Sequence, residues 1–149
     1  MSVKRQIKRN KFKHQFKKAN ETKEEIKEIL SYLNDVESHI DGVITKIDEF
    51  KSTLNDEQKD LKQIATSLES EMGAIKDTLQ NNETKEAVKV LNDYKYRSRF
   101  TSDDLFNIQK HGAELLSIYF AWQSSLKDYH LAITAHIHKN PNKENKDGE

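Results

Sequence analysis

The sequence contains no cysteine and few of the residues that interrupt helices. The absence of cysteine excludes disulfide bonds and thiolate chemistry, which fits a reducing cytoplasm. One proline and four glycines leave few positions at which the chain of 149 residues has to turn. No segment approaches the run of about 18 apolar residues that a membrane-spanning helix needs, and no apolar stretch follows the charged N-terminus as in a signal peptide. We therefore expect a cytoplasmic protein without a membrane span.

Apolar residues are also scarce. Hydrophobic residues make up 34% of the chain and charged residues another 34%, against averages of about 45–50% and about 25% in globular domains. The chain has too few apolar side chains to fill a thick core. We therefore predict an all-α fold in which long helices form an elongated helical bundle. Frequent Lys, Asn and Ile are typical of an AT-rich genome, and we interpret the chain as a bacterial or phage protein.

The net charge is zero, but the charges are unevenly distributed along the chain. Residues 1–20 carry eight Lys or Arg and no acid, whereas residues 21–80 carry seven Lys or Arg against fifteen Asp or Glu. Residues 81–149 hold ten of each sign. This division predicts a basic flexible arm over 1–19, followed by an acidic helical region.

After the arm, an apolar residue falls at every seventh position, which indicates a long amphipathic helix. At the companion position the apolar series decays after Phe50 and moves to Ala65, Met72 and Leu79. The apolar band is therefore wider than a two-stranded seam. We predict a coiled-coil-like helix over 20–80 and a homodimer or larger assembly whose interface consists of the heptad residues. These residues are Ile26, Leu33, Ile40, Ile47, Leu54, Leu61, Leu68 and Ile75.

The pentapeptide Asn-Glu-Thr-Lys-Glu occurs twice, at 20–24 and 82–86, and we interpret each copy as the start of a helix. Thr22 and Glu25 of the first copy match a capping box. The sequence around Asn55 also has the residues of a helix break. The heptads stay in register across it, however, and we expect the helix to continue.

Residues 81–139 are expected to form a helical hairpin that packs on the long helix. Its first helix lies near 83–98. Its second begins at a Thr-Ser-Asp-Asp capping signal and runs over about 102–138, where a proline ends it. Trp122 lies near the middle of the apolar stripe of this second helix, and we expect it to be buried. We predict a disordered tail over 140–149.

The sequence contains no convincing catalytic, metal-binding or nucleotide-binding motif. The four glycines lie 31 or more residues apart, so they cannot form a phosphate-binding loop. His130, His136 and His138 come nearest to a metal cluster, but their side chains diverge around a helix. Ser124 and Lys127 match an SxxK motif whose companion motifs are absent. We therefore predict no enzymatic activity, no cofactor and no metal site.

The basic arm is the segment with the strongest indication of binding. Its cations can neutralise phosphates and its two phenylalanines can stack on bases, which makes nucleic-acid contact a candidate function. Two other interpretations stay open. In the first, the arm stays in solvent or lies along the acidic helix, where salt screens the contact. In the second, it docks on an acidic protein or lipid surface. The candidate nucleic-acid contacts are Lys4, Arg5, Lys8, Arg9, Lys11, Phe12, Lys13, Phe16, Lys17 and Lys18.

A basic segment ahead of heptads is similar to the arrangement in basic leucine zippers. This sequence lacks their Asn-x-x-Ala-Ala core, so we assign no family. The leading prediction is a non-enzymatic interaction or assembly protein, an adaptor or scaffold, that self-associates and presents a helical surface to an unidentified protein partner. The alternative is a nucleic-acid-binding accessory protein of a bacterium or mobile element that binds through the arm.

Overall fold

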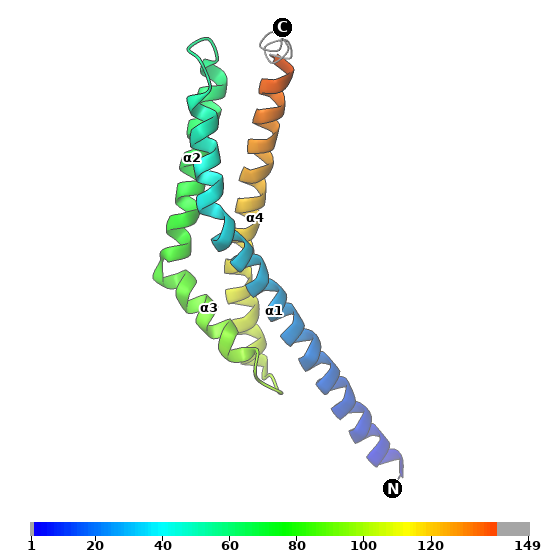
Figure 1. Ribbon diagram of the computed structural model, residues 1–149. Coiled ribbons are helices and arrows are strands. Elements are labelled where there is room, and N and C mark those ends of the chain that lie inside the picture. Colours follow the sequence, from blue (N-terminus) through cyan, green and yellow to red (C-terminus); the bar gives the residue numbers. More distant parts are fainter. Residues whose placement is uncertain (1, 140–149) are drawn as a thin grey trace. The chain divides into compact units, whose positions relative to one another are not determined.

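The fold is all-α, as the sequence predicts. The computed structural model describes residues 2–139, and it describes the side chains of residues 18–137. No strand occurs within this range. The helices are α1 (Ser2–Ser52), α2 (Lys59–Gln80), α3 (Asn82–Tyr94) and α4 (Ser102–Lys139) (Figure 1).

The chain divides into two compact units, and each unit packs three helical segments. Unit 1 comprises the residues up to Asp35 and Gln80–Ser117, and unit 2 comprises Val36–Leu79 and the residues from Ile118 on. The long helices α1 and α4 therefore contribute a segment to both units, whereas α3 belongs to unit 1 and α2, except for its last residue, to unit 2. In each unit a short connection joins two antiparallel helices (Figure 1). The connection between α3 and α4 in unit 1 was predicted, whereas the connection between α1 and α2 in unit 2 was not.

The first copy of the pentapeptide lies inside a helix, so its interpretation as a helix start is wrong. Helix α1 begins at Ser2 and continues through the copy without a break. The hydroxyl of Thr22 donates a hydrogen bond of 2.9 Å to the carbonyl oxygen of Lys18, one turn earlier. Because a threonine can satisfy its hydroxyl in this way, a capping residue does not by itself require a helix to begin. The segment 1–19, predicted as a separate arm, is thus continuous with α1 from Ser2 on.

The predicted continuous helix over 20–80 is also wrong, because the chain turns at residues 53–58. The backbone amide of Thr53 still bonds the carbonyl oxygens of Glu49 and Phe50, and α1 ends there. Asn55 then donates its amide to the side chain of Gln58 over 3.0 Å and accepts from the amide of Glu57 over 3.1 Å. These bonds replace helical hydrogen bonds within the turn, so the polar residues that suggested a break do form one.

The heptad register continues across the turn because both α1 before it and α2 after it bury an apolar face. Leu54 lies in the turn itself and is buried, as are Ile47 before it and Leu61 after it. A seven-residue repeat reports that these side chains are buried. It does not report whether one straight helix or two antiparallel helices bury them.

The starts of α3 and α4 follow local capping rules. The side chain of Asn81 accepts a hydrogen bond of 2.8 Å from the amide of Thr84, so the second pentapeptide does mark a helix start. At α4, the amide of Asp104 donates to the Thr101 hydroxyl over 3.1 Å, and the amide of Thr101 donates to the Asp104 carboxylate over 2.9 Å. This reciprocal pair is a capping box, and it lies at the helix start that the sequence predicts. Helix α3 ends at Tyr94, four residues before its predicted end.

The core of unit 1 lies between α3 and the parts of α1 and α4 that belong to this unit. Ile26 of α1, Leu91 of α3 and Leu115 of α4 are almost completely buried. Gly112 of α4 faces Ile29 of α1, where an added Cβ would lie 3.1 Å from the Ile29 Cδ1 atom. The absence of a side chain at this position therefore permits close packing of the two helices.

The core of unit 2 lies between α2 and the remaining segments of α1 and α4. Ile47 of α1 and Met72 of α2 are fully buried, and Trp122 of α4 is 5% exposed. The predicted burial of this single tryptophan is confirmed. Tyr129 of α4 is also buried, and its ring lies edge to face with that of Phe50, with the centroids 6.2 Å apart.

Candidate functional site

The predicted oligomer interface is the hydrophobic core of a single chain. The eight heptad residues have exposed fractions between 0% and 8% without a second copy present. For the heptad residues of unit 2 the physical reason is the turn at 53–58, because it folds α2 back along the end of α1. Ile26 and Leu33 belong to unit 1 and are buried in its core. The structure therefore gives these residues a packing role and does not support their assignment to an interface between copies. They are Ile26, Leu33, Ile40, Ile47, Leu54, Leu61, Leu68 and Ile75.

The candidate nucleic-acid contacts fall almost entirely outside the described side chains. Lys18 alone among them is described, and it is exposed. The others, from Lys4 to Lys17, lie on the helical backbone of α1, but their side chains are outside the described residues. Binding of nucleic acid by this segment stays a prediction.

Unit 2 has a groove between α2 and α4 that the sequence did not predict. Its volume is about 650 Å³. Helix α2 lines it with one face from Asp60 to Glu71, and α4 lines it with one face from Asp128 to Ala135. The floor includes the buried side chains of Leu68 and Ala132, together with Leu61. The groove is therefore a depression between two helices of the same unit.

Large apolar side chains lie exposed along this groove. Ile64 of α2 is 43% exposed and Leu131 of α4 is 57% exposed. Ile64 stands at the companion position of the heptad pattern after the apolar series has moved to Ala65, and Leu131 lies outside the apolar stripe of its own helix. An aliphatic residue off the main stripe was the one sequence signal that could have indicated this surface.

The polar residues of the groove are acidic or neutral. Asp60 and Glu71 stand on α2 and Asp128 stands on α4, and none of the described residues that line the groove is a lysine or arginine. Glu71 is held in place because the hydroxyl of Ser125, a buried residue of α4, donates a hydrogen bond of 3.0 Å to its Oε2 atom. The groove thus combines apolar contact area with negative charge.

The surrounding unit is acidic as a whole. Residues 36–79 and 118–137 contain six Lys or Arg and eleven Asp or Glu, a formal net charge of −5. Three of the six cations form ion pairs within the unit, which are Lys51 with Glu69, Lys62 with Asp56, and Lys76 with Asp41. None of these three ion pairs includes Asp60, Glu71 or Asp128 of the groove.

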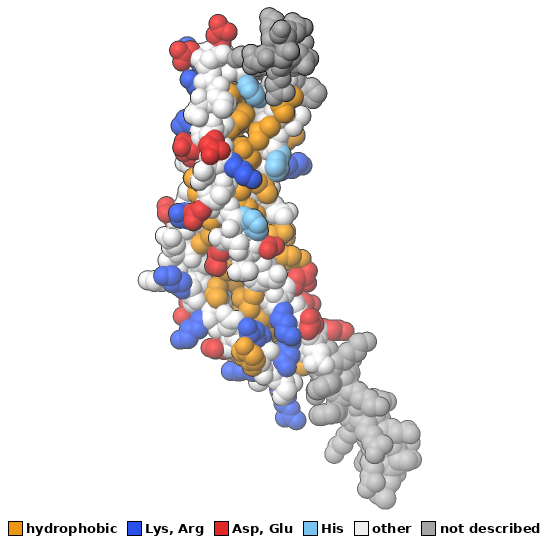
Figure 2. All heavy atoms as spheres, viewed as in Figure 1, with side chains coloured by type: hydrophobic (Ala, Val, Ile, Leu, Met, Phe, Trp, Pro, Cys, Tyr) orange, Lys and Arg blue, Asp and Glu red, His pale blue; other side chains and the backbone are white. Residues whose placement is uncertain are grey.

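A second apolar surface of unit 2 follows the seam between α1 and α4 and is visible in Figure 2. Its aromatic residues contact one another: the ring of Phe50 lies edge to face with the rings of Tyr129 and His136. The Nε2 atom of Gln58 lies 3.0 Å from Nδ1 of His136. Burial, followed by the nearby charge of Glu49, raises the pKa of the Tyr129 phenol. Because these side chains satisfy one another, the cluster has a packing role.

The histidines of α4 do not form a metal site within the described residues. His136 is directed to Phe50 and Gln58, whereas His130 is exposed beside Tyr129. Among the side chains that the structure describes, no group of three or more His, Asp or Glu converges on one point. His138 lies outside these side chains.

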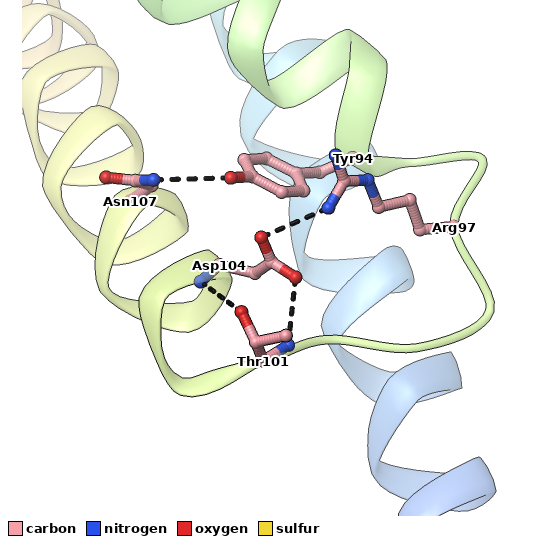
Figure 3. A network of polar contacts seen from close by, with 5 residues as sticks. All are labelled: Tyr94, Arg97, Thr101, Asp104 and Asn107. Carbon is pink, nitrogen blue, oxygen red and sulfur yellow. Dashed lines mark hydrogen bonds and ion pairs between the residues drawn. The ribbon is translucent and has the colours of Figure 1, made fainter.

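A polar network fixes the connection between α3 and α4 in unit 1 (Figure 3). The Arg97 guanidinium forms an ion pair of 3.1 Å with Asp104 and lies over the Tyr94 ring, 4.7 Å from its centroid. The side-chain amide of Asn107 donates to the Tyr94 hydroxyl over 3.3 Å. The hydrogen bond from the Thr101 amide is the main reason that the pKa of Asp104 lies below its ordinary value. The arrangement stabilises the start of α4 and offers no reactive group.

The part of the chain that the structure describes has no helix with both the length and the apolar content to cross a membrane. No model of a known protein family matches the chain, and no curated protein or solved structure shows significant similarity to it.

Proposed function

We propose that the protein is a non-enzymatic helical interaction protein, an adaptor or scaffold, that binds a partner protein in the groove between α2 and α4. The observation that carries this proposal is the exposure of Ile64 and Leu131 along a groove of about 650 Å³. Exposed aliphatic side chains that gather in a groove are typical of a surface that another molecule covers.

The gain from covering this surface favours binding. Removing apolar area from water stabilises a complex by about 25 cal/mol per Å², and the buried residues beneath the groove give a partner a packed floor. An apolar groove between two neighbouring helices commonly binds the apolar face of a third, amphipathic helix. The secondary structure of the site therefore suits a helical ligand.

The distribution of titratable groups supports the non-enzymatic part of the proposal. Active sites usually hold groups whose pKa is strongly shifted. Among the described residues, the shifted groups are Asp104, which belongs to a helix cap, and Tyr129, which packs against Phe50. Neither residue lines the groove.

A selection from a displayed library of amphipathic helical peptides tests the proposal. The apolar and flanking positions of the library are randomised, and the full chain is the target. We expect enriched peptides that bind the native chain but not Leu131→Gln. The matched control is Phe120→Gln, because Phe120 is 61% exposed on the same helix but does not line the groove. Peptides that bind both variants like the native chain, or a selection without enrichment, would contradict the proposal.

Binding of nucleic acid is the second candidate function. Besides the basic N-terminal segment, the connection after α3 contributes Lys95, Arg97 and Arg99, and Tyr96 between them is 79% exposed. Cations next to an exposed aromatic ring suit the phosphates and bases of a single strand. Arg97 already pairs with Asp104, so part of the positive charge of this connection is neutralised within the fold.

A further inference from the structure

We infer that the partner in the groove between α2 and α4 is a basic amphipathic helix of another protein. This inference rests on the proposed function and specifies the chemistry of the partner. A matching helix presents apolar residues at positions i, i+3, i+4 and i+7, with Lys or Arg along both edges of this stripe. The dimensions of the groove, its residues and its charge each favour this ligand.

The length of the groove accommodates about three helical turns. On α2, the lining residues from Asp60 to Glu71 extend over about 17 Å at 1.5 Å per residue. They recur at three- and four-residue intervals, so they form one continuous face of α2. A partner helix of equal length can follow this face throughout.

The sizes of the lining side chains permit close contact between helices. Ser67 on α2 and Ala132 and Ala135 on α4 are small, which allows a helix axis to approach to about 8–10 Å. The larger Ile64 and Leu131 are exposed beside them and can insert between the side chains of the ligand. An alternation of small and large residues is the surface that ridges-into-grooves packing requires.

The acidic residues surround the apolar floor. Asp60 and Glu71 mark the two ends of the lining face of α2, and Asp128 stands on the opposite helix. Cations on both edges of a ligand helix would therefore each find a carboxylate. The hydrogen bond from Ser125 orients the carboxylate of Glu71 before any ligand arrives, which reduces the ordering that binding requires.

The N-terminal segment of a second copy is a weaker match, although it is basic. It carries eight cations, but Val3 and Ile7 fall about 180° from Phe12 and Phe16 on a helical wheel. The segment thus lacks the single apolar stripe that a groove ligand needs. The charge of unit 2 also disfavours a second acidic unit as the occupant, because like charges would meet across the contact.

Three synthetic peptides test the inference with the full-length chain. All have about 18 residues and the same leucine stripe, and their flanking positions are Lys, Gln or Glu, so that only charge differs between them. Fluorescence anisotropy of the labelled peptides gives their affinities between about 50 and 300 mM salt. We expect the Lys peptide to bind at least tenfold more tightly than the Gln peptide, the Glu peptide to bind most weakly, and this difference to shrink with salt.

Variants then locate the binding. We expect Leu131→Gln to weaken all three peptides, whereas Phe120→Gln leaves them unchanged. The neutral triple variant Asp60→Asn, Glu71→Gln, Asp128→Asn should weaken the Lys peptide on the order of tenfold and the Gln peptide little. Its control, Glu37→Gln, Asp48→Asn, Asp77→Asn, removes the same number of charges from exposed positions of unit 2 away from the groove and should have little effect.

The outcomes separate this inference from the proposed function. Equal binding of the three peptides, lost in Leu131→Gln, would overturn the preference for a basic helix and leave the groove as the docking site. Binding of the Lys peptide that Leu131→Gln does not weaken would overturn both. No binding of the Lys peptide would overturn the inference, while the library selection decides the proposed function. A dimer of the free chain that Leu131→Gln dissociates would show that a second copy is the occupant and would also overturn it.

Discussion

The hydroxyl of Ser125 in α4 donates a hydrogen bond of 3.0 Å to the carboxylate of Glu71 in α2. Ser125 is buried, so replacing it with alanine leaves the carboxylate without this donor. We expect Ser125→Ala to lower the free energy of unfolding by about 1 kcal/mol, measured by urea denaturation. The neighbouring Ser124 is exposed, and Ser124→Ala should have little effect. Equal losses in the two variants would show that the hydrogen bond contributes nothing measurable.

The burial of the heptad residues within one chain leads to a prediction about concentration. Ile47→Ala removes a fully buried side chain and should lower the free energy of unfolding by about 2–5 kcal/mol. Because this burial requires no second copy, the melting temperature of the variant and of the native chain should not change over a tenfold dilution. Circular dichroism melts check both points. A melting temperature that falls on dilution would restore the heptad residues to an interface between copies.

The single tryptophan reports on the core of unit 2. Trp122 is 5% exposed, so iodide should quench its fluorescence only after unfolding. Trp122→Ala should lower the free energy of unfolding by about 3–5 kcal/mol. Phe120→Ala, at an exposed position of the same helix, serves as the control and should change it by well under half as much. Full quenching in the native chain would contradict the packing described for unit 2.

The cap of α4 predicts a pH dependence of stability. The hydrogen bond from the Thr101 amide lowers the pKa of Asp104 below its ordinary value of 3.8. A carboxyl group with a lowered pKa in the folded state stabilises the fold above its ordinary pKa, and this stabilisation disappears as the pH falls through the lowered pKa. Asp104→Asn should therefore be less stable than the native chain at neutral pH, with a difference that shrinks in acid.

The control for the cap is Asp103→Asn. Asp103 lies in the same first turn but forms no such hydrogen bond with Thr101. Denaturation of both variants between neutral pH and about pH 2 gives the comparison. A pH profile for Asp104→Asn that equals that of Asp103→Asn would assign the effect to general charge in the turn.

The basic N-terminal segment can be tested for nucleic-acid binding in the full-length chain. If the segment binds single-stranded oligonucleotides, the logarithm of the binding constant should fall with the logarithm of the salt concentration, with a slope of about −0.7 per phosphate contact. The reason is that binding releases counterions from the phosphates, and this release is less favourable at high salt. A variant with glutamine at Lys8, Arg9, Lys11 and Lys13 should lose about half of this slope, because it removes four of the eight cations of the segment. The matched control has glutamine at Lys85, Lys89, Lys110 and Lys127, four exposed lysines outside the segment. Equal losses in the two variants would remove the segment from the interaction.

The sequence predicted burial better than connectivity. The heptad residues from Ile26 to Ile75 are buried, although the sequence assigned them to an interface between copies, and the stripe of α4 correctly included Trp122. The heptad series could not show that the chain turns at 53–58, because antiparallel helices bury an apolar face with the same spacing that one long helix would use. Asn55 and Gln58 form the turn with hydrogen bonds that a helical continuation would have left unmade.

Capping patterns were informative only where the chain also had a reason to turn. The same pentapeptide starts α3 at its second copy and lies within α1 at its first. At the first copy, the hydroxyl of Thr22 bonds the carbonyl oxygen of Lys18, and the helix continues. The groove could not be predicted, because it depends on which helices become neighbours. Once α2 lies beside α4, Ile64 and Leu131 come together although they are 67 positions apart in the sequence.

The turn between α1 and α2 has a consequence for how this chain can vary. No described residue of the protein has a positive φ angle, so the turn uses backbone conformations that every L-amino acid adopts. Leu54 anchors it in the core, while Asn55, Asp56 and Glu57 are exposed. Insertions after Leu54 should therefore be tolerated during evolution, and a fluorescent reporter or affinity tag could be placed there while the helices on either side keep their packing.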